Sequence, residues 1–230
     1  VWIFDLKTRS FEYDVTKRLS SIGITGTSIQ TVTMGSDGRL WLCTKDRKLL
    51  MCNRTGRIND AVESIALPPD MELPVIMEEY NDRIWIMSMN GILAEYAPPI
   101  KDFKTIKKIP LDSSEGLSSR MEMDINSKGD IWIMFDKVLF NYDVREETFK
   151  ETVSIPAGSK DLLTTIALDN SDNLWIGTAR SGVSLINARD GQIQTLPYLE
   201  MINGKRIYHH TDISKIYIDS DDGVWIATLS

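Results

Sequence analysis

Three observations on the sequence predict an all-β fold made of repeated four-stranded units. Five of the six tryptophans stand inside short apolar runs, at spacings of 44, 47, 43 and 50 residues. This period matches the roughly 40–50 residues of a four-stranded propeller blade and exceeds the roughly 34 residues of helical repeats. Each tryptophan also follows an apolar segment and a turn rich in Asp, Asn or Gly. We therefore predict a β-propeller of four-stranded antiparallel blades, about five blades' worth. The tryptophans in this frame are Trp41, Trp85, Trp132, Trp175 and Trp225.

The first two strands of a blade, strands a and b, are predicted to form a hairpin closed by the acidic turn. Asp and Asn side chains in such turns accept hydrogen bonds from backbone N–H groups two residues on, and Gly or Asn tolerates positive φ. Strand b carries the tryptophan between aliphatic residues, so both of its faces are apolar, as burial between two neighbouring blades requires. We therefore expect all five tryptophans of the frame to be buried between blades. The strands a are predicted at 29–34, 75–77, 121–125, 165–168 and 213–218.

Strand c and an edge strand d complete each blade. Strand c follows the tryptophan strand after a short loop, and a turn bearing Asp, Asn or Gly then leads to strand d. The strands c are predicted at 48–52, 92–96, 138–142 and 183–186. The strands d are predicted near 57–58 and at 103–106, 149–152 and 192–196.

The chain is predicted to begin and end within a blade. Residues 1–5 align with 139–143, and Phe11 then matches Phe149, so the N-terminal residues supply strands c and d. The C-terminal residues supply strands a and b, and we expect the two halves to join and close a ring; the alternative is an open piece of a longer propeller. Residues 1–230 are thus expected to form a single β-propeller domain or fragment. It comprises a half-blade at 1–20, blades at about 28–67, 73–110, 119–156 and 162–197, an extra hairpin at 198–209 and a half-blade at 212–230.

The composition excludes several classes of function. Lys and Arg total 26 against 33 for Asp and Glu, and the formal net charge of −7 leaves no basic surplus to neutralise phosphates. Nucleic acid is therefore not expected as a partner. No apolar run in the sequence approaches the roughly 20 residues that cross a bilayer. The sequence also lacks a Gly-x-Ser-x-Gly elbow, a P-loop and a His-Glu-x-x-His pair, so we expect no catalysis in this region.

No metal or other cofactor is expected either. The two histidines, His209 and His210, are adjacent, so an extended backbone points them to opposite sides. Segment 219–223 resembles a calcium loop, but its glycine is the fifth residue and no glutamate stands at the twelfth position.

The two cysteines, Cys43 and Cys52, are predicted on opposite arms of a hairpin that turns near Asp46 and Arg47. Their odd separation in sequence suggests that both side chains lie on the same face of the hairpin. The geometry then allows a disulfide between them. Two reduced thiols packed as small apolar groups are the favoured alternative.

Candidate ligand-binding residues are predicted on one face of the propeller. The loops between strands b and c emerge on the same face as the connections between blades, and they carry Arg and Asn, whose planar donors suit carboxylates or hydroxyls. The longest connection contains an extra hairpin with an Asn203–Gly204 turn. Its Tyr and His side chains offer flat surfaces with polar tips, although the hairpin can equally cover the channel or pack on a neighbouring domain. The candidates are Arg47, Asn90, Arg180, Tyr198, Tyr208 and His210.

Three copies of the repeat resemble a known family. Segments 28–44, 169–178 and 216–228 share an acidic turn followed by a Trp-Ile-Gly-Thr-like strand, and 181–187 resembles a Gly-Leu-like entry to strand c. Over nearly the whole chain this pattern is similar to the two-component regulator propeller repeat. The Gly-Thr pair is replaced by Met-Ser at 87–88 and by Met-Phe at 134–135, which departs from the family pattern.

The resemblance implies the periplasmic sensor region of a bacterial hybrid two-component system. Rings of about seven blades are usual there, and another β domain, a membrane helix and a histidine kinase follow them. It therefore implies a non-catalytic part of the ectodomain of an inner-membrane protein, which recognises an oligosaccharide or another small ligand. The implied partners are a neighbouring propeller or β domain of the same chain and, in the full receptor, a second copy forming a homodimer.

Two other functions stay open at this point. One is a non-catalytic protein-interaction propeller scaffold, because a fold does not dictate its function. The other is a propeller lyase, whose chemistry would need a metal, an acid and a histidine near the channel.

Overall fold

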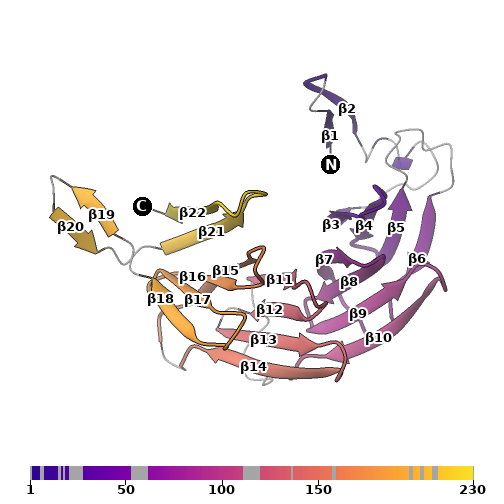
Figure 1. Cartoon of the computed structure of the whole chain (residues 1–230). Coiled ribbons are helices and arrows are strands. Elements are labelled where there is room, and N and C mark those ends of the chain that lie inside the picture. Colours follow the sequence, from indigo (N-terminus) through magenta and orange to yellow (C-terminus); the bar gives the residue numbers. More distant parts are fainter. Residues whose placement is uncertain are drawn as a thin grey trace. The chain divides into compact units, whose positions relative to one another are not determined.

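The strands of this protein form the antiparallel sheets of a β-propeller, which confirms the predicted all-β fold class (Figure 1). The computed structural model describes residues 2–5, 8–14, 17, 19–20, 28–52, 62–110, 120–135, 137–156, 159–196, 199–202, 205–208 and 212–229. Within these residues, four sheets have four strands and three have two strands. The chain divides into two compact units, residues 1–113 and 114–230, and each is described by itself.

The first unit contains a hairpin and two complete blades. Each strand pairs antiparallel with the next one in sequence, so short connections suffice within a blade. The hairpin consists of β1 (Trp2–Asp5) and β2 (Ser10–Asp14). Blade 1 consists of β3 (Ile29–Met34), β4 (Leu40–Thr44), β5 (Lys48–Cys52) and β6 (Glu63–Ala66). Blade 2 consists of β7 (Pro74–Tyr80), β8 (Arg83–Ser88), β9 (Ile92–Ala97) and β10 (Asp102–Lys108).

The second unit contains two complete blades, a hairpin and a half-blade. Blade 3 consists of β11 (Met121–Ile125), β12 (Ile131–Phe135), β13 (Val138–Asp143) and β14 (Thr148–Ser154). Blade 4 consists of β15 (Leu163–Leu168), β16 (Leu174–Thr178), β17 (Val183–Ile186) and β18 (Ile193–Leu196). The hairpin consists of β19 (Leu199–Ile202) and β20 (Lys205–Tyr208), as the Asn-Gly signal predicts. Half-blade 5 consists of β21 (Asp212–Ile218) and β22 (Val224–Leu229).

One predicted strand is misplaced. Strand d of blade 1 was predicted near residues 57–58, which lie outside the described residues. The structure instead places it at β6, where Ala66 pairs with Lys48 and Glu63 pairs with Met51. The segment 63–66 alternates half-buried and exposed side chains, the pattern that an edge strand needs, and the isolated pair at 57–58 offers no such run.

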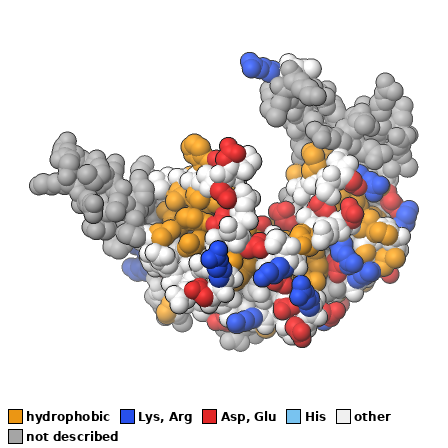
Figure 2. Space-filling model, in the orientation of Figure 1, with side chains coloured by type: hydrophobic (Ala, Val, Ile, Leu, Met, Phe, Trp, Pro, Cys, Tyr) orange, Lys and Arg blue, Asp and Glu red, His pale blue; other side chains and the backbone are white. Residues whose placement is uncertain are grey.

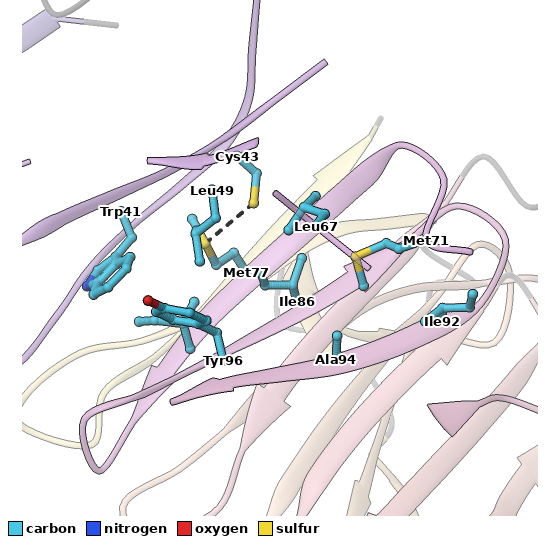
Figure 3. Close-up of a cluster of buried hydrophobic side chains, with 11 residues drawn as sticks. Trp41, Cys43, Leu49, Leu67, Met71, Met77, Ile86, Ile92, Ala94 and Tyr96 are labelled. Atoms are coloured by element: carbon cyan, nitrogen blue, oxygen red, sulfur yellow. Dashed lines mark hydrogen bonds between the residues drawn. The ribbon is translucent and has the colours of Figure 1, made fainter. Parts of the chain in front are cut away.

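Apolar packing between blades 1 and 2 forms the core of the first unit (Figure 3). Trp41 and Cys43 come from strand b of blade 1, and Met77, Ile86 and Tyr96 come from blade 2. The rings of Trp41 and Tyr96 meet edge to face with their centroids 5.8 Å apart. One blade therefore provides the cover for the apolar face of the next.

The second unit repeats this arrangement twice. One apolar cluster joins blade 3 to blade 4, with Trp132 packed against its margin beside Met134 and Ile176. A second cluster joins blade 4 to half-blade 5, where Trp175 packs near Ile213 and Ile216 of β21. Each of these tryptophans belongs to the cluster that its blade shares with the next one in sequence.

The predicted burial of the five tryptophans is confirmed only in part. Trp41 and Trp85 are buried, at 3% and 2% exposed. Trp132 and Trp175 are half-buried. Trp225 is 65% exposed, so the prediction is wrong for this residue. It lies on β22 of the two-stranded sheet, on the face opposite to that of its neighbour Val224, which packs against the cluster shared with blade 4.

The prediction that both cysteines share one face is wrong. Cys43 lies opposite Leu49 in the β4–β5 ladder, and Cys52 is three positions beyond Leu49. An odd offset along a strand changes the face. Cys43 thus packs in the cluster shared with blade 2, its Sγ 3.9 Å from Met77 Sδ, whereas Cys52 packs in the cluster with Leu42 and Leu50. Both thiols are free, and burial raises their pKa, to about 12 for Cys43 and about 11 for Cys52.

Four of the turns between strands a and b share one hydrogen-bonded design. In each, the N–H of the first loop residue donates to the carbonyl of the fifth, over 2.8–3.0 Å. The fourth residue has positive φ, which explains glycine at Gly38 and Gly129 and strained aspartates at Asp172 and Asp222. The loops are 35–39, 126–130, 169–173 and 219–223.

An aspartate at the first loop position links the turn to the tryptophan six residues later. Asp169 accepts from the backbone N–H of Asn173 at 2.9 Å and from Trp175 Nε1 at 3.0 Å. Asp219 accepts from Trp225 Nε1 at 2.7 Å in the same way. Burial raises the pKa of Asp169, but the hydrogen bonds from Asn173 and Trp175 outweigh it and hold that pKa below its usual value. The aspartates of these turns therefore stabilise the hairpin and hold the indole in place.

The same loops also connect neighbouring blades. The N–H of Ser127, second in its loop, donates to Asp172 Oδ1 of blade 4 at 2.8 Å, and the Ser127 hydroxyl donates to the other carboxylate oxygen. The N–H of Asn170 donates likewise to Asp222 Oδ1 of half-blade 5 at 3.0 Å. In the first unit, Ser36 donates to Glu79 of blade 2. In each case a carboxylate accepts hydrogen bonds from the adjacent blade, and this contact links the two blades in addition to their shared apolar core.

We expect Trp41→Ala to lower the free energy of unfolding by about 3–5 kcal/mol, the range for large aromatic deletions in a core. Urea denaturation measures this loss. Ile106→Ala, on edge strand β10 with half of its surface exposed, is the control and should cost less than about 1 kcal/mol. Equal losses in the two variants would contradict the packing described for the Trp41 indole.

Candidate functional site

One end of each blade gathers the b–c loops, the first residues of strand a and the connections from the preceding blade. This follows from the antiparallel order of the strands, which places the a–b and c–d turns at the opposite end. The sequence predicts its candidate ligand residues at this loop end. Whether these side chains are available to a ligand depends on what they already bind.

A buried hydroxyl closes the b–c loop in three blades. Thr44 donates to the carbonyl of Lys48 at 3.3 Å, Ser88 to that of Ile92 at 3.2 Å and Thr178 to that of Gly182 at 3.2 Å. This is the physical reason for threonine at the end of the Trp-Ile-Gly-Thr-like strand. The departure from the family pattern at residues 87–88 keeps this hydroxyl, so blade 2 retains the loop closure.

Arg47 and Asn90 converge on one connection of the first unit. Arg47 Nη2 donates to the carbonyl oxygens of Pro68 and Pro69 at 2.9 and 2.6 Å. Asn90 Nδ2 donates to the carbonyl of Asp70 at 2.8 Å, and Asn90 Oδ1 accepts from the N–H of Glu72 at 3.2 Å. The two predicted candidates therefore hold the connection between blades 1 and 2 from both sides.

Arg180 has the corresponding position in the second unit. Its Nε donates to the carbonyl of Lys160 at 3.1 Å, and the neighbouring Ser181 hydroxyl donates to the carboxylate of Asp161. Both contacts reach the connection that leads into strand a of blade 4. Side chains of the b–c loops thus order the connections of this end, a structural role that sequence reasoning did not foresee.

The remaining candidates lie in or beside the extra hairpin. Tyr208 is the last residue of β20, and its side chain is outside the described part of the structure. Tyr198 and His210 are themselves outside the described residues. The structure therefore brings Arg47 and Asn90 together and places Arg180 at the same end of its own blade.

A polar network joins the inner strands of the second unit. Glu122 on β11 accepts from Thr165 Oγ1 and the N–H of Ile166 on β15, both at 2.8 Å, and from Lys215 Nζ on β21 at 2.7 Å. Asp124 accepts from the N–H of Leu168 at 2.8 Å. Burial raises the pKa of Asp124, and its backbone hydrogen bonds and Lys215 oppose the rise. The network fixes the three strands a in one register.

A cavity of about 320 Å³ opens where these strands begin. Two β-bulges shape it. The pairing of β15 with β16 shifts between Leu163 and Thr165, which leaves Thr164 as the inserted residue, and the pairing of β21 with β22 shifts around Ser214. The cavity is lined by Arg120, Met121, Glu122, Thr164, Ser214 and Leu229.

Sequence reasoning missed Thr164 as an inner-strand residue because it predicted strand a of blade 4 only from residue 165. An inserted residue interrupts the alternation on which that prediction depends. The one available signal was the break itself, two adjacent threonines at 164–165 after an apolar leucine.

A second cavity, of about 410 Å³, lies at the opposite end of the first unit, between the a–b turns of blades 1 and 2 and the prolines at 98–99. Three of its charged side chains, Asp37, Arg39 and Glu79, are already engaged. Arg39 pairs with Asp37 at 3.1 Å, and Glu79 accepts from Ser36 and from the N–H of Asp82. The described part of the chain contains no group of three or more His, Cys, Asp or Glu side chains arranged to hold a metal ion.

No protein-family model matches the chain, and no curated protein matches its sequence. Among solved structures, it is similar to one described as the extracellular domain of a hybrid two-component system, BT3049 from B. thetaiotaomicron, with a TM-score of 0.65 and 18% identity. That likeness covers 98% of this chain and 29% of the other, so this chain spans less than a third of that structure.

Two further structures are similar. One is described as the extracellular domain of the hybrid two-component system BT4673 from B. thetaiotaomicron, with a TM-score of 0.45, 14% identity and coverage of 90% of this chain and 38% of that one. The other is YCF48 from Cyanidioschyzon merolae, with a TM-score of 0.65, 11% identity and coverage of 96% and 70%. The chain is thus similar in structure to an extracellular domain of a hybrid two-component system, as its repeat resemblance predicts, and at this identity the likeness establishes the fold alone.

Asn90→Ala should lower the free energy of unfolding by about 1–3 kcal/mol, because it leaves the N–H of Glu72 and the carbonyl of Asp70 without their partner. Lys45→Ala, an exposed change in the b–c loop of blade 1, is the control and should stay within about 0.5 kcal/mol of the unmodified protein. Chemical denaturation of both variants measures the difference. An unchanged stability for Asn90→Ala would refute its role in holding the connection.

Proposed function

We propose that this chain is part of the ligand-sensing, extracytoplasmic region of a hybrid two-component receptor, and that the ligand is an oligosaccharide. The observation that carries the proposal is the resemblance of the sequence to the two-component regulator repeat. The structure gives a physical reason for the acidic turn, the indole and the closing hydroxyl of that pattern. The likeness to an extracellular domain of such a system supports the same class. In this proposal the region resides in the periplasm, as an ectodomain of an inner-membrane protein.

The proposed region senses and does not catalyse. Arg47 and Arg180 are exposed at the loop end, and a guanidinium has more donors than the ones that hold the connections, which suits recognition of hydroxyl-rich molecules. Among the described residues, no helix is both long enough and apolar enough to cross a bilayer. The signal would pass to a neighbouring propeller or β domain of the same chain and to a second copy in a homodimer.

A protein-interaction scaffold is the second candidate, and one surface favours it. Hydrophobic side chains gather over β21 and β22 (Figure 2), where Tyr217, Trp225 and Leu229 are each about 60% exposed. Exposed apolar patches mark interaction surfaces more often than isolated exposed residues do. The same patch also fits an adjoining β domain of a receptor.

The test is titration of a panel of oligosaccharides against the purified protein by calorimetry. We expect at least one oligosaccharide to bind, and Arg180→Ala and Tyr208→Ala each to weaken its affinity by about tenfold, or 1.4 kcal/mol. Arg189→Ala, an exposed change in the c–d turn at the opposite end of blade 4, is the control and should bind as the unmodified protein does. Absence of binding across the panel would contradict glycan sensing, and unchanged affinity in both test variants would exclude the loop end.

A further inference from the structure

We propose that the cavity between the a–b turns of blades 1 and 2 binds an amino sugar, one of whose hydroxyl groups accepts a hydrogen bond from Trp41 Nε1. This cavity lies at the end of the first unit opposite the loop end, so the proposal goes beyond the receptor function and does not depend on it. Its volume of about 410 Å³ is at the small end of ligand cavities, which suits a small molecule better than a long chain.

The a–b turn of blade 1 lacks the aspartate that binds the indole in two other sheets. In blade 4, Asp169 accepts from the N–H of the fifth loop residue at 2.9 Å and from the indole N–H of Trp175 at 3.0 Å. In half-blade 5, Asp219 accepts from the fifth loop residue and from Trp225 Nε1, both at 2.7 Å. The first loop position of blade 1 is Gly35, which has no side chain to offer.

A different residue of blade 1 replaces only one of these two hydrogen bonds. Asp37 Oδ1 accepts from the N–H of Arg39, the fifth loop residue, at 2.8 Å. Among the described residues, no group accepts from Trp41 Nε1. This nitrogen lies 3.3 Å from the point where a Cβ on Gly35 would be, and both residues line the cavity. Figure 3 shows the nitrogen at the edge of the indole that faces away from Met77.

Trp41 is the observation that points to a ligand. Its side chain is 3% exposed, and a buried N–H without an acceptor destabilises the folded state. Because the nitrogen lies at the wall of the cavity, an oxygen atom inside the cavity can reach it, as the Asp169 carboxylate reaches the indole of blade 4. A sugar hydroxyl supplies such an acceptor.

The charges of the cavity favour a cation over an anion. Its lining includes Asp37, Arg39, Glu79 and Asp82, so three carboxylates are present with one guanidinium. Arg39 already pairs with Asp37 at 3.1 Å. The exposed carboxylate of Asp82 has no partner among the described side chains and is available to an ammonium group, whereas a ligand carboxylate would be repelled there.

The remaining wall suits a hydroxylated ring. Glu79 accepts from the N–H and hydroxyl of Ser36 and from the N–H of Asp82, and a carboxylate has about four lone-pair sites, so one is left for a ligand hydroxyl. Ile84 and the prolines at 98–99 offer apolar contact to the C–H groups of a ring. An amino sugar combines the ammonium group, the hydroxyl groups and the apolar C–H surface that this lining requires.

The experiment follows the indole N–H cross-peaks in proton–nitrogen correlation NMR spectra during titration with D-glucosamine, D-glucose or D-glucuronate. These probes share one ring and differ in charge, and the titration is made below neutral pH, where the amino group carries a proton. D-glucosamine should shift the Trp41 cross-peak, which the Trp41→Phe spectrum identifies, and should bind most tightly of the three. The cross-peaks of Trp175 and Trp225 should stay in place, because aspartates already bind their N–H groups.

Two variants test the location and the charge. Gly35→Asp combined with Asp37→Ser gives blade 1 the aspartate and serine of the blade 4 turn at unchanged net charge. Its new carboxylate should accept from Trp41 Nε1, keep or raise the melting temperature and weaken D-glucosamine binding by about fivefold or more. Asp82→Asn, at a positive φ that asparagine tolerates, should weaken D-glucosamine by about two- to fivefold and leave D-glucose unchanged. Asp221→Asn, the same charge change at an exposed turn of half-blade 5, is the control and should change neither affinity.

The opposite results would overturn the proposal. Tighter binding of D-glucose or D-glucuronate than of D-glucosamine would contradict the amino-sugar class. Unchanged D-glucosamine affinity in the double variant would contradict the location, and if that variant fails to fold, unchanged affinity in Asp82→Asn does so in its place. A Trp41 cross-peak that none of the three sugars shifts would show that the cavity holds water alone. The receptor proposal is tested separately at the loop end by Arg180→Ala and Tyr208→Ala, so either proposal can fail without the other.

Discussion

Burial of the tryptophan-bearing strand on both faces is the constraint on which the rest of this structure depends. A single four-stranded sheet has two apolar faces here, and it can cover neither by itself. Strand β4 is buried along its whole length because blade 2 packs against one face and, on the other face, its Leu40 and Leu42 pack in a separate cluster with Leu19. The blades therefore stabilise one another, and the loops at their ends have fixed positions only because the sheets below them do.

Polar contacts add specificity to this apolar packing. Carboxylates on inner strands and a–b turns accept hydrogen bonds from the adjacent blade, as Glu122 does from Thr165 and Asp172 does from Ser127. Each such bond contributes modestly to stability, about 0.5–1.5 kcal/mol. Their directional geometry fixes the register between blades, which apolar contacts alone leave loose. The positions of Thr164 and Ser214 in the cavity of the second unit depend on that register.

The strands could be predicted from the sequence because alternation, indole spacing and turn chemistry all indicate the same blades. One strand, strand d of blade 1, was placed too early in the sequence. The other errors arise where one residue changes a face or a neighbour is absent. Cys52 was assigned to the wrong face because that inference used the separation of the two cysteines and not the pairing partner of Cys43. Trp225 has the same sequence frame as Trp41, but its burial depends on a covering sheet, which no local pattern reports.

The cavity of the second unit depends on bulges and on three strands distant in sequence, so composition and spacing could not locate it. Arg47, Asn90 and Arg180 lie at the loop ends of their blades, and their contacts with the inter-blade connections are tertiary and have no local signal.

A double-mutant cycle between Trp41 and Tyr96 tests the central claim most directly, because these side chains belong to different blades and meet across their shared core. Trp41→Leu, Tyr96→Leu and the double variant would be compared by urea denaturation. Mutual support between the blades predicts a coupling energy of about 0.5–1.5 kcal/mol, the usual value for an edge-to-face aromatic pair. Additive losses in the double variant would show that the two blades are stabilised independently and would contradict the account.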